Sequence, residues 1–139
     1  NSCLGGSKKI QSITIKSKEV FLDNNCFYNC VNLQSILFEN VEKAQIGQYA
    51  FNGCNSLQKF SISVSSDLSI YDYGFTGAFY LNTVELYCYT LNLGNFLFYQ
   101  SSHIRDITIQ CSEKNSKIGQ CSFFGMNMNM KPQINLYNI

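Results

Sequence analysis

Charged residues are scarce in this chain of 139 residues. The 10 Lys and Arg and the 9 Asp and Glu residues make up 14% of the sequence and leave a net charge of +1. In an average soluble domain about a quarter of the residues are charged. A chain with this balance has no basic surface of the kind that binds nucleic acid or anionic lipid. We therefore expect no nucleic acid among its partners.

Long hydrophobic runs are absent as well. None approaches the ~20 consecutive apolar residues that a membrane-spanning helix needs, so we expect no membrane insertion. The basic and then apolar segment of a secretion signal does not follow Asn1. Because the chain starts without Met and inside a repeat, we expect it to be a piece of a longer protein.

Residues suited to catalysis or metal binding are few. The chain has one histidine, His103, which we expect on an exposed turn, and no Cys-x-x-Cys pair. A zinc site needs several Cys or His ligands at short spacing. The carboxylates are scattered, and no motif places a nucleophile beside a base. We expect no enzymatic activity, no cofactor and no metal.

What the sequence does contain is a repeat of about 23 to 25 residues, counted from Phe51 as the anchor. The anchor column reads Leu4, Phe27, Phe51, Phe75, Phe98 and Phe123. Four further columns keep step with it: Leu22, Ile46, Ile70, Leu93, Ile118; Ile10, Leu33, Leu57, Leu81, Ile104; Ile13, Ile36, Phe60, Val84, Ile107; and Ile15, Phe38, Ile62, Leu86, Ile109. Apolar columns at a fixed period in this range indicate a solenoid, and we expect Phe51 and Leu57 in its core.

Each repeat predicts two short parallel strands. Segments such as Ser12 to Lys16 and Lys59 to Ser63 alternate polar with apolar residues, and a shorter alternation precedes each anchor, as at Ala44 to Ile46. Between them the apolar residues recur every three positions, which predicts a helical or 3-10 turn.

The segment Ile46 to Ile62 carries a family resemblance. It reads Ile-Gly-x-x-Ala-Phe-x-x-Cys-x-x-Leu-x-x-Phe-x-Ile and is similar to the repeat of the BspA-type leucine-rich repeat proteins. The last repeat departs most, because Asn129 and Pro132 stand where Leu and Ile belong, unless a two-residue insertion moves the pattern to Ile134 and Leu136. The resemblance implies a surface-displayed interaction module without catalytic residues.

Together these patterns predict a β-rich solenoid: a leucine-rich repeat array that forms one domain over residues 1–139, with about five full coils and a partial first coil. Glycines at Gly47, Gly94 and Gly119 recur once per repeat and are expected to form tight turns that need a permissive backbone.

The seven cysteines leave two interpretations open. The register makes neighbours of Cys3 and Cys26, of Cys30 and Cys54, and of Cys88 and Cys111, and leaves Cys121 alone. Their parallel Cβ vectors would hold the Cβ atoms about 4.8 Å apart instead of the ~3.8 Å of a disulfide. We therefore favour buried thiols over three disulfides.

Function is expected on the outward face of the long parallel sheet, where a solenoid has room for it. The candidate binding residues are Lys59, Glu85, Tyr87, Tyr89 and Asp106, and the expected ligand is a protein or a glycan. The turn aromatics are the alternative surface: Tyr49, Tyr73, Phe79, Tyr80, Phe96, Tyr99 and Phe124.

The alternative function is that of a structural subunit that stacks end to end into a filament, because its end coils carry apolar columns with little polar capping. The resemblance implies an extracellular or cell-surface location, with the cytoplasm as the alternative.

Overall fold

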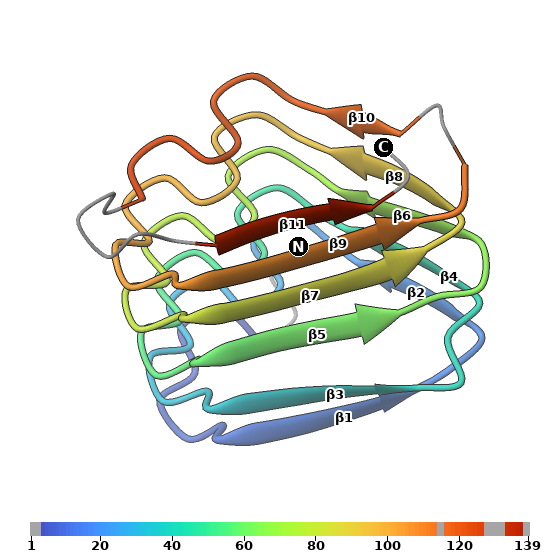
Figure 1. Ribbon diagram of the computed structural model, residues 1–139. Helices are drawn as coiled ribbons and strands as arrows, with labels where there is room; N and C mark the ends of the chain where they lie inside the picture. The colour runs from blue at the N-terminus through green and yellow to red at the C-terminus, as the bar shows by residue number, and fades with distance from the viewer. Residues whose placement is uncertain (1–3, 114–115, 127–132, 138–139) are drawn as a thin grey trace.

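The computed structural model describes residues 4–113, 116–126 and 133–137, and these form a parallel β-solenoid (Figure 1). Each coil gives one strand to a long face and one to a short face, as the repeat predicts. The long-face strands are β1 (Ser12–Lys16), β3 (Ser35–Glu39), β5 (Lys59–Ser63), β7 (Thr83–Cys88), β9 (Asp106–Cys111) and β11 (Gln133–Tyr137). The short-face strands are β2 (Glu19–Leu22), β4 (Lys43–Ile46), β6 (Asp67–Ile70), β8 (Thr90–Leu93) and β10 (Lys117–Ile118).

The strand register follows the sequence columns. Ile13 lies opposite Ile36, and Val84 opposite both Phe60 and Ile107. β11 pairs with β9 through Ile134 opposite Ile107 and Leu136 opposite Ile109, so the two-residue insertion is confirmed. Asn129 and Pro132 lie outside the described residues.

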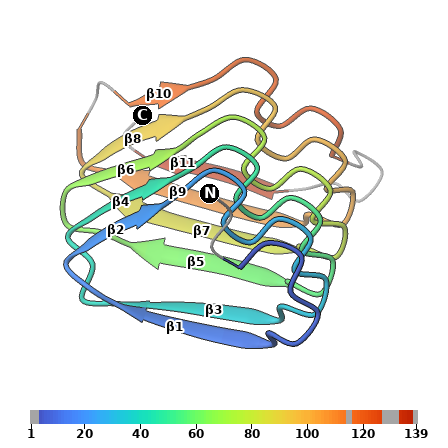
Figure 2. The same cartoon turned by 180° about the vertical axis from the view of Figure 1, so that it is seen from behind.

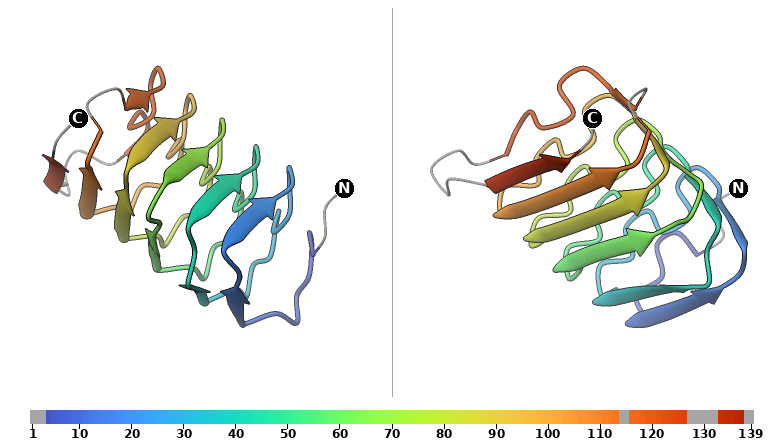
Figure 3. Two further views of the ribbon diagram at one scale, coloured as in Figure 1. Left: turned by 90° about the vertical axis from the view of Figure 1, so that its right-hand side faces the viewer. Right: turned by 45° about the vertical axis from the view of Figure 1, so that its right-hand side comes forward.

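The anchor column forms a stack of rings through the middle of the solenoid. Figure 3 shows the successive coils that carry these rings lying side by side. Ring centroids are 5.2 Å apart for Phe27 and Phe51, 5.2 Å for Phe51 and Phe75, and 5.6 Å for Phe75 and Phe98. Phe51 and Leu57 are 0% exposed, which confirms that both belong to the core.

The stretch between the short strand and the next long strand is not helical, contrary to the expectation of a helical or 3-10 turn. No helix occurs among the described residues. Instead, two kinds of backbone hydrogen bond alternate: Cys54 N–H donates to Phe51 O three residues earlier, at 3.1 Å, whereas Phe51 N–H donates to Gly74 O of the next coil, at 2.8 Å. The three-residue period therefore comes from successive turns whose intervening N–H groups pair between coils.

The residues of one column of this stretch adopt the left-handed conformation, which excludes a continuous right-handed helix. The column two residues before the anchor includes Tyr49, Tyr73 and Phe96, with φ values of 55°, 59° and 51°. Bulky side chains rarely adopt positive φ. Here the rings stack, with centroids 4.9 Å apart for Tyr49 and Tyr73 and 5.4 Å for Tyr73 and Phe96. We attribute the tolerance of this strained backbone to the aromatic ladder.

The repeated glycines are required for a different reason from the one expected. Gly47, Gly94 and Gly119 are not among the residues with positive φ. A Cβ atom at Gly94 would lie 2.4 Å from the backbone N of Asp72, and one at Gly47 would lie 2.6 Å from the backbone N of Asn24. Glycine is needed because adjacent coils approach too closely for a side chain.

The two faces differ in continuity. The short face is one sheet of five strands, from β2 to β10, whereas the long face is split into β1–β3 and β5–β7–β9–β11. Figure 2 shows β1 and β3 set apart from β5 on this face. The continuous long sheet that the sequence predicts is therefore interrupted between the second and third coils.

Candidate functional site

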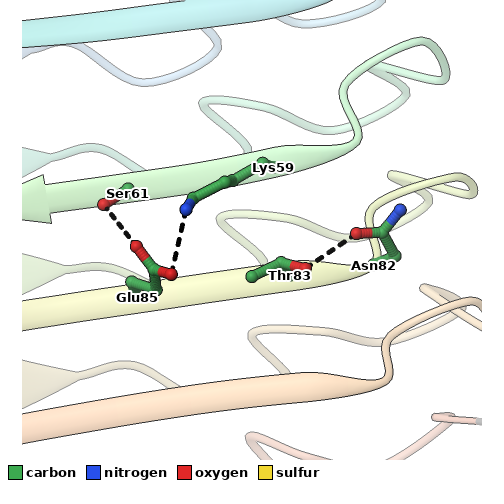
Figure 4. Close-up of polar contacts among 5 residues, drawn as sticks. All are labelled: Lys59, Ser61, Asn82, Thr83 and Glu85. Atoms are coloured by element: carbon green, nitrogen blue, oxygen red, sulfur yellow. Dashed lines mark hydrogen bonds and ion pairs between the residues drawn. The ribbon is translucent and has the colours of Figure 1, made fainter.

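The outward face of β5 and β7 carries a small polar network (Figure 4). Lys59 Nζ lies 2.9 Å from Glu85 Oε1, and the Ser61 hydroxyl donates to Glu85 Oε2 at 3.0 Å. The network forms because β5 and β7 pair in register, with Ser61 opposite Glu85. The hydrogen bond from Lys59, assisted by the one from Ser61, holds the pKa of Glu85 below its usual range. An ion pair this open to solvent adds at most about 1 kcal/mol of stability.

Tyr87 and Tyr89 lie near the carboxyl-terminal end of β7. They help to line a shallow pocket of about 320 Å³ together with Ser63, Gln110 and Ser112. Tyr87 is an outward residue of β7, whereas β7 ends at Cys88 and Tyr89 lies beyond it. The sequence places Tyr89 on the outward face of the long sheet, but the strand does not extend that far. The chain has turned there, and Tyr89 N–H donates to Ser66 O at 2.9 Å.

The five candidate residues form two groups: Lys59, Glu85 and Asp106 on strands of the long face, and Tyr87 and Tyr89 at the end of β7 and just beyond it. Lys59 and Asp106 both lie opposite Thr83, which places them about 9.6 Å apart across two strand spacings. Tyr87 lies opposite Ser63, four residues or about 13 Å along the strand from Lys59. The surface of one partner protein is large enough to contact both groups. The pocket beside Tyr87 and Tyr89 belongs to the second group alone.

The turn aromatics form a ladder with exposed neighbours. Tyr49, Tyr73 and Phe96 are half-buried in their stack, while Phe79, Tyr80 and Phe124 are 43%, 53% and 59% exposed. His103 is half-buried, not exposed as expected. Its ring centroid lies 4.4 Å from that of Phe79 and 5.3 Å from that of Tyr80, so the two aromatic side chains cover it.

The cysteines of the described residues are thiols, and all but Cys121 are buried. Cys30 donates to Leu4 O at 3.1 Å, and Cys54 to Phe27 O at 3.2 Å. Ser101 occupies the same column and donates to Phe75 O at 2.6 Å. This column therefore supplies a hydrogen-bond donor to the preceding coil, a role beyond the small apolar filler that the sequence suggested.

The remaining cysteines behave differently. Cys88 and Cys111 lie side by side with their Sγ atoms 3.5 Å apart, well beyond the ~2.05 Å of a disulfide. Cys3 lies outside the described residues.

Burial raises the pKa of Cys54 to about 12, and burial, with the neighbouring Cys111, raises that of Cys88. Because only the thiolate reacts rapidly, these thiols are expected to be inert in the folded protein.

We expect alkylation to separate buried from exposed thiols. At pH 8, native protein should take up label at Cys121 while Cys30, Cys54, Cys88 and Cys111 stay unlabelled. In denaturant without reductant, mass spectrometry should find label on at least five of the seven cysteines. A reduced sample serves as the control for complete labelling. Label on only one cysteine of the unreduced sample would show that the three column pairs are disulfides.

The described residues contain no group of three or more His, Cys, Asp or Glu side chains placed to hold a metal ion. They also form no helix that is long and apolar enough to cross a membrane.

Comparison with known families agrees with the repeat. The family model described as the BspA type leucine rich repeat region (6 copies) matches residues 1–76, more than half of the chain. No curated protein and no solved structure matches the chain.

Proposed function

The chain belongs to the BspA type leucine rich repeat family, and from this premise we propose that it is a non-catalytic module that binds a protein through the outward side of its long face. The observation that carries the proposal is the pair Tyr87 and Tyr89 beside a solvent-open pocket. Tyrosine is enriched at protein interfaces because it brings a rigid apolar ring with a polar tip.

The surroundings of the two tyrosines suit a protein partner. The pocket offers the hydroxyl groups of Ser63 and Ser112 and the amide of Gln110, while Lys59, Glu85 and Asp106 add charges of both signs farther along the face. Mixed charge around an aromatic centre matches the usual interface, an apolar core with a polar rim. A glycan ligand uses the same polar groups and is tested alongside. A location at the cell surface or outside the cell is part of the proposal.

We expect the double variant Tyr87→Ala and Tyr89→Ala to weaken binding to a captured partner by about 2 kcal/mol, or roughly 30-fold in Kd, if these residues are hot spots. Immobilised wild type, the double variant and Tyr71→Ala are compared as baits, and affinities are then measured by surface plasmon resonance. Tyr71 is the matched control because it is 46% exposed and follows β6 on the short face. A glycan array probed with the same proteins tests the other ligand class.

The result that would contradict this proposal is unchanged affinity in the double variant while circular dichroism shows an intact fold. The turn aromatics or the end coils would then be the candidate binding surface.

A second candidate is end-to-end stacking into a filament. It is favoured by β11, whose five residues are all exposed, with Ile134 at 38% and Leu136 at 46%. A parallel edge strand with exposed apolar side chains is a template for further pairing. Sedimentation velocity at several protein concentrations distinguishes the candidates, because only stacking produces species that grow with concentration.

A further inference from the structure

The long face contains an unpaired seam between β3 and β5 (Figure 1). In the neighbouring coils, Ser35 N–H donates to Gln11 O at 3.3 Å, Thr83 N–H to Gln58 O at 3.2 Å and Asp106 N–H to Asn82 O at 3.1 Å. The equivalent bond from Lys59 to Gln34 is missing. Over residues 34–39 and 58–63, all of which are described, no backbone hydrogen bond joins the two strands.

The pattern of the intact ladders shows which backbone groups are left free at the seam. Outward-facing residues such as Thr83 bond to the preceding coil, and inward-facing residues bond to the following coil, as Val64 N–H does to Tyr87 O at 2.8 Å. The unpaired N–H and C=O groups are therefore those of two inward residues of β3 and three outward residues of β5: Ile36, Phe38, Lys59, Ser61 and Ser63.

The same residues line a groove. A cavity of about 380 Å³ opens between the strands and is bounded by Ile36, Leu37 and Phe38 on one side and by Lys59, Ser61 and Ser63 on the other. Leu37 is 53% exposed at its rim. The groove thus combines free backbone donors and acceptors with apolar side chains.

Two bulky side chains explain why the sheet opens here. Phe38 stands in a column that is otherwise Ile or Leu, and Phe60 in one that is otherwise Ile or Val. Their rings pack edge to face between β3 and β5, with centroids 5.6 Å apart. In addition, Asn40 turns the chain at a φ of 58°, where the later coils continue inward with Val64 and Cys88. The larger rings and the early turn hold β3 away from β5, while β4 and β6 of the same two coils stay paired.

We propose that this groove binds an extended peptide segment of a partner protein, which adds a strand between β3 and β5. The partner is identified by the unpaired backbone groups, since only another extended backbone satisfies two facing strand edges at once. Its alternate side chains are apolar, to lie against Ile36 and Phe38, and polar outward, beside Lys59 and Ser61. The groove shares Ser63 with the Tyr87 and Tyr89 pocket, but its occupant is held by the unpaired strand edges and needs neither tyrosine.

Full insertion requires β3 and β5 to stand two strand spacings apart, about 9.6 Å. The change is confined to the long face if the corner at Asn40 opens, because β4 stays paired with both β2 and β6 on the short face. The contact between Phe38 and Phe60 is lost, and a peptide side chain between the two rings replaces it.

A pair of proline substitutions tests whether the seam is open. Ser61→Pro should leave the melting temperature close to that of the wild type, because the Ser61 N–H has no partner and proline is tolerated at a strand edge. Thr108→Pro is the matched control. Thr108 occupies the same column of β9, and its N–H belongs to an intact ladder with β7, so this variant should melt at a clearly lower temperature.

A peptide probe tests binding. The probe is a fluorophore-labelled copy of residues 105–110, which contains all of β9 except Cys111. β9 lies between two strands of this chain, and Arg105 and Asp106 keep the peptide soluble. We expect saturable binding by fluorescence anisotropy. It should weaken at least tenfold with Ser61→Pro, and equally when Ile107 and Ile109 of the peptide are N-methylated, which removes backbone donors and leaves the side chains. The Tyr87→Ala and Tyr89→Ala variant should bind the probe as the wild type does.

Amide hydrogen exchange provides the independent readout. In the free protein the amides of Ile36, Phe38, Lys59, Ser61 and Ser63 should exchange faster than those of Phe60 and Ile62, and the probe should protect them. Protection already present in the dilute free protein would overturn the proposal, as would equal binding of the methylated peptide or no saturable binding. Protection that appears only as protein concentration rises would overturn it in favour of a second copy of this chain.

Discussion

Replacing Phe51 with alanine should lower the free energy of unfolding by about 3 to 5 kcal/mol. The ring is 0% exposed and lies between the rings of Phe27 and Phe75, with both centroids 5.2 Å away. A third ring, that of Phe60, meets it edge to face at 5.3 Å. Alanine would leave a cavity that two stacked coils cannot fill, because the backbone hydrogen bonds between coils fix their spacing.

Chemical denaturation followed by circular dichroism measures the loss. Phe21→Ala is the matched control, because Phe21 is 58% exposed on β2 and its truncation should change stability by about 0.5 kcal/mol or less. A loss below ~1 kcal/mol for Phe51→Ala would mean that the anchor column does not carry the core.

The sequence was sufficient to predict the periodic parts of the fold. The anchor column locates the ring stack, and the columns of Ile36, Phe60 and Val84 predict the strand register, because stacked coils bury the same positions. Even the irregular last repeat was predictable, since Ile134 and Leu136 restore the apolar alternation two residues late and pair as that shift requires.

The parts that could not be predicted depend on contacts between coils and not on patterns within one. A period of three residues fits a helix as well as successive turns. Turns form here because N–H groups such as that of Phe51 pair with the next coil and not within a helix. The seam at β3 is of the same kind. Phe38 and Phe60 look like ordinary apolar residues in their columns, and only the edge-to-face contact of their rings across two coils relates them to the seam.

The candidate site was predicted in part. The alternation of β7 placed Glu85 and Tyr87 outward, as observed, but it could not show that the strand ends at Cys88 and that Tyr89 follows a turn. The ion pair of Lys59 with Glu85 depends on the pairing of β5 with β7. His103 was misjudged because the aromatic side chains that cover it, Phe79 and Tyr80, belong to the preceding coil.

Gly94→Ala should destabilise the protein by about 3 kcal/mol, the upper part of the range for an overpacked core. The added methyl group would lie 2.4 Å from the backbone N of Asp72 and 2.6 Å from both the Asp72 side-chain oxygen and the carbonyl carbon of Tyr71. Asp72 cannot move aside freely, because its Oδ1 accepts a hydrogen bond from Asn95 N–H at 2.7 Å. Relief of the clash requires two coils to separate, which strains the parallel pairing of β6 with β8.

Gly77→Ala separates this steric effect from backbone strain. Gly77 has a φ of 65°, but the nearest atom to an added Cβ lies 3.8 Å away. Its alanine variant should therefore lose only about 1 to 2 kcal/mol from the left-handed backbone. Gly77→Asn should lose less, because Asn29 occupies the same column of another coil at a φ of 54°. The expected order of melting temperatures is wild type, Gly77→Asn, Gly77→Ala and then Gly94→Ala. If Gly94→Ala melted above Gly77→Ala, the close approach of the coils would not be what selects glycine at position 94.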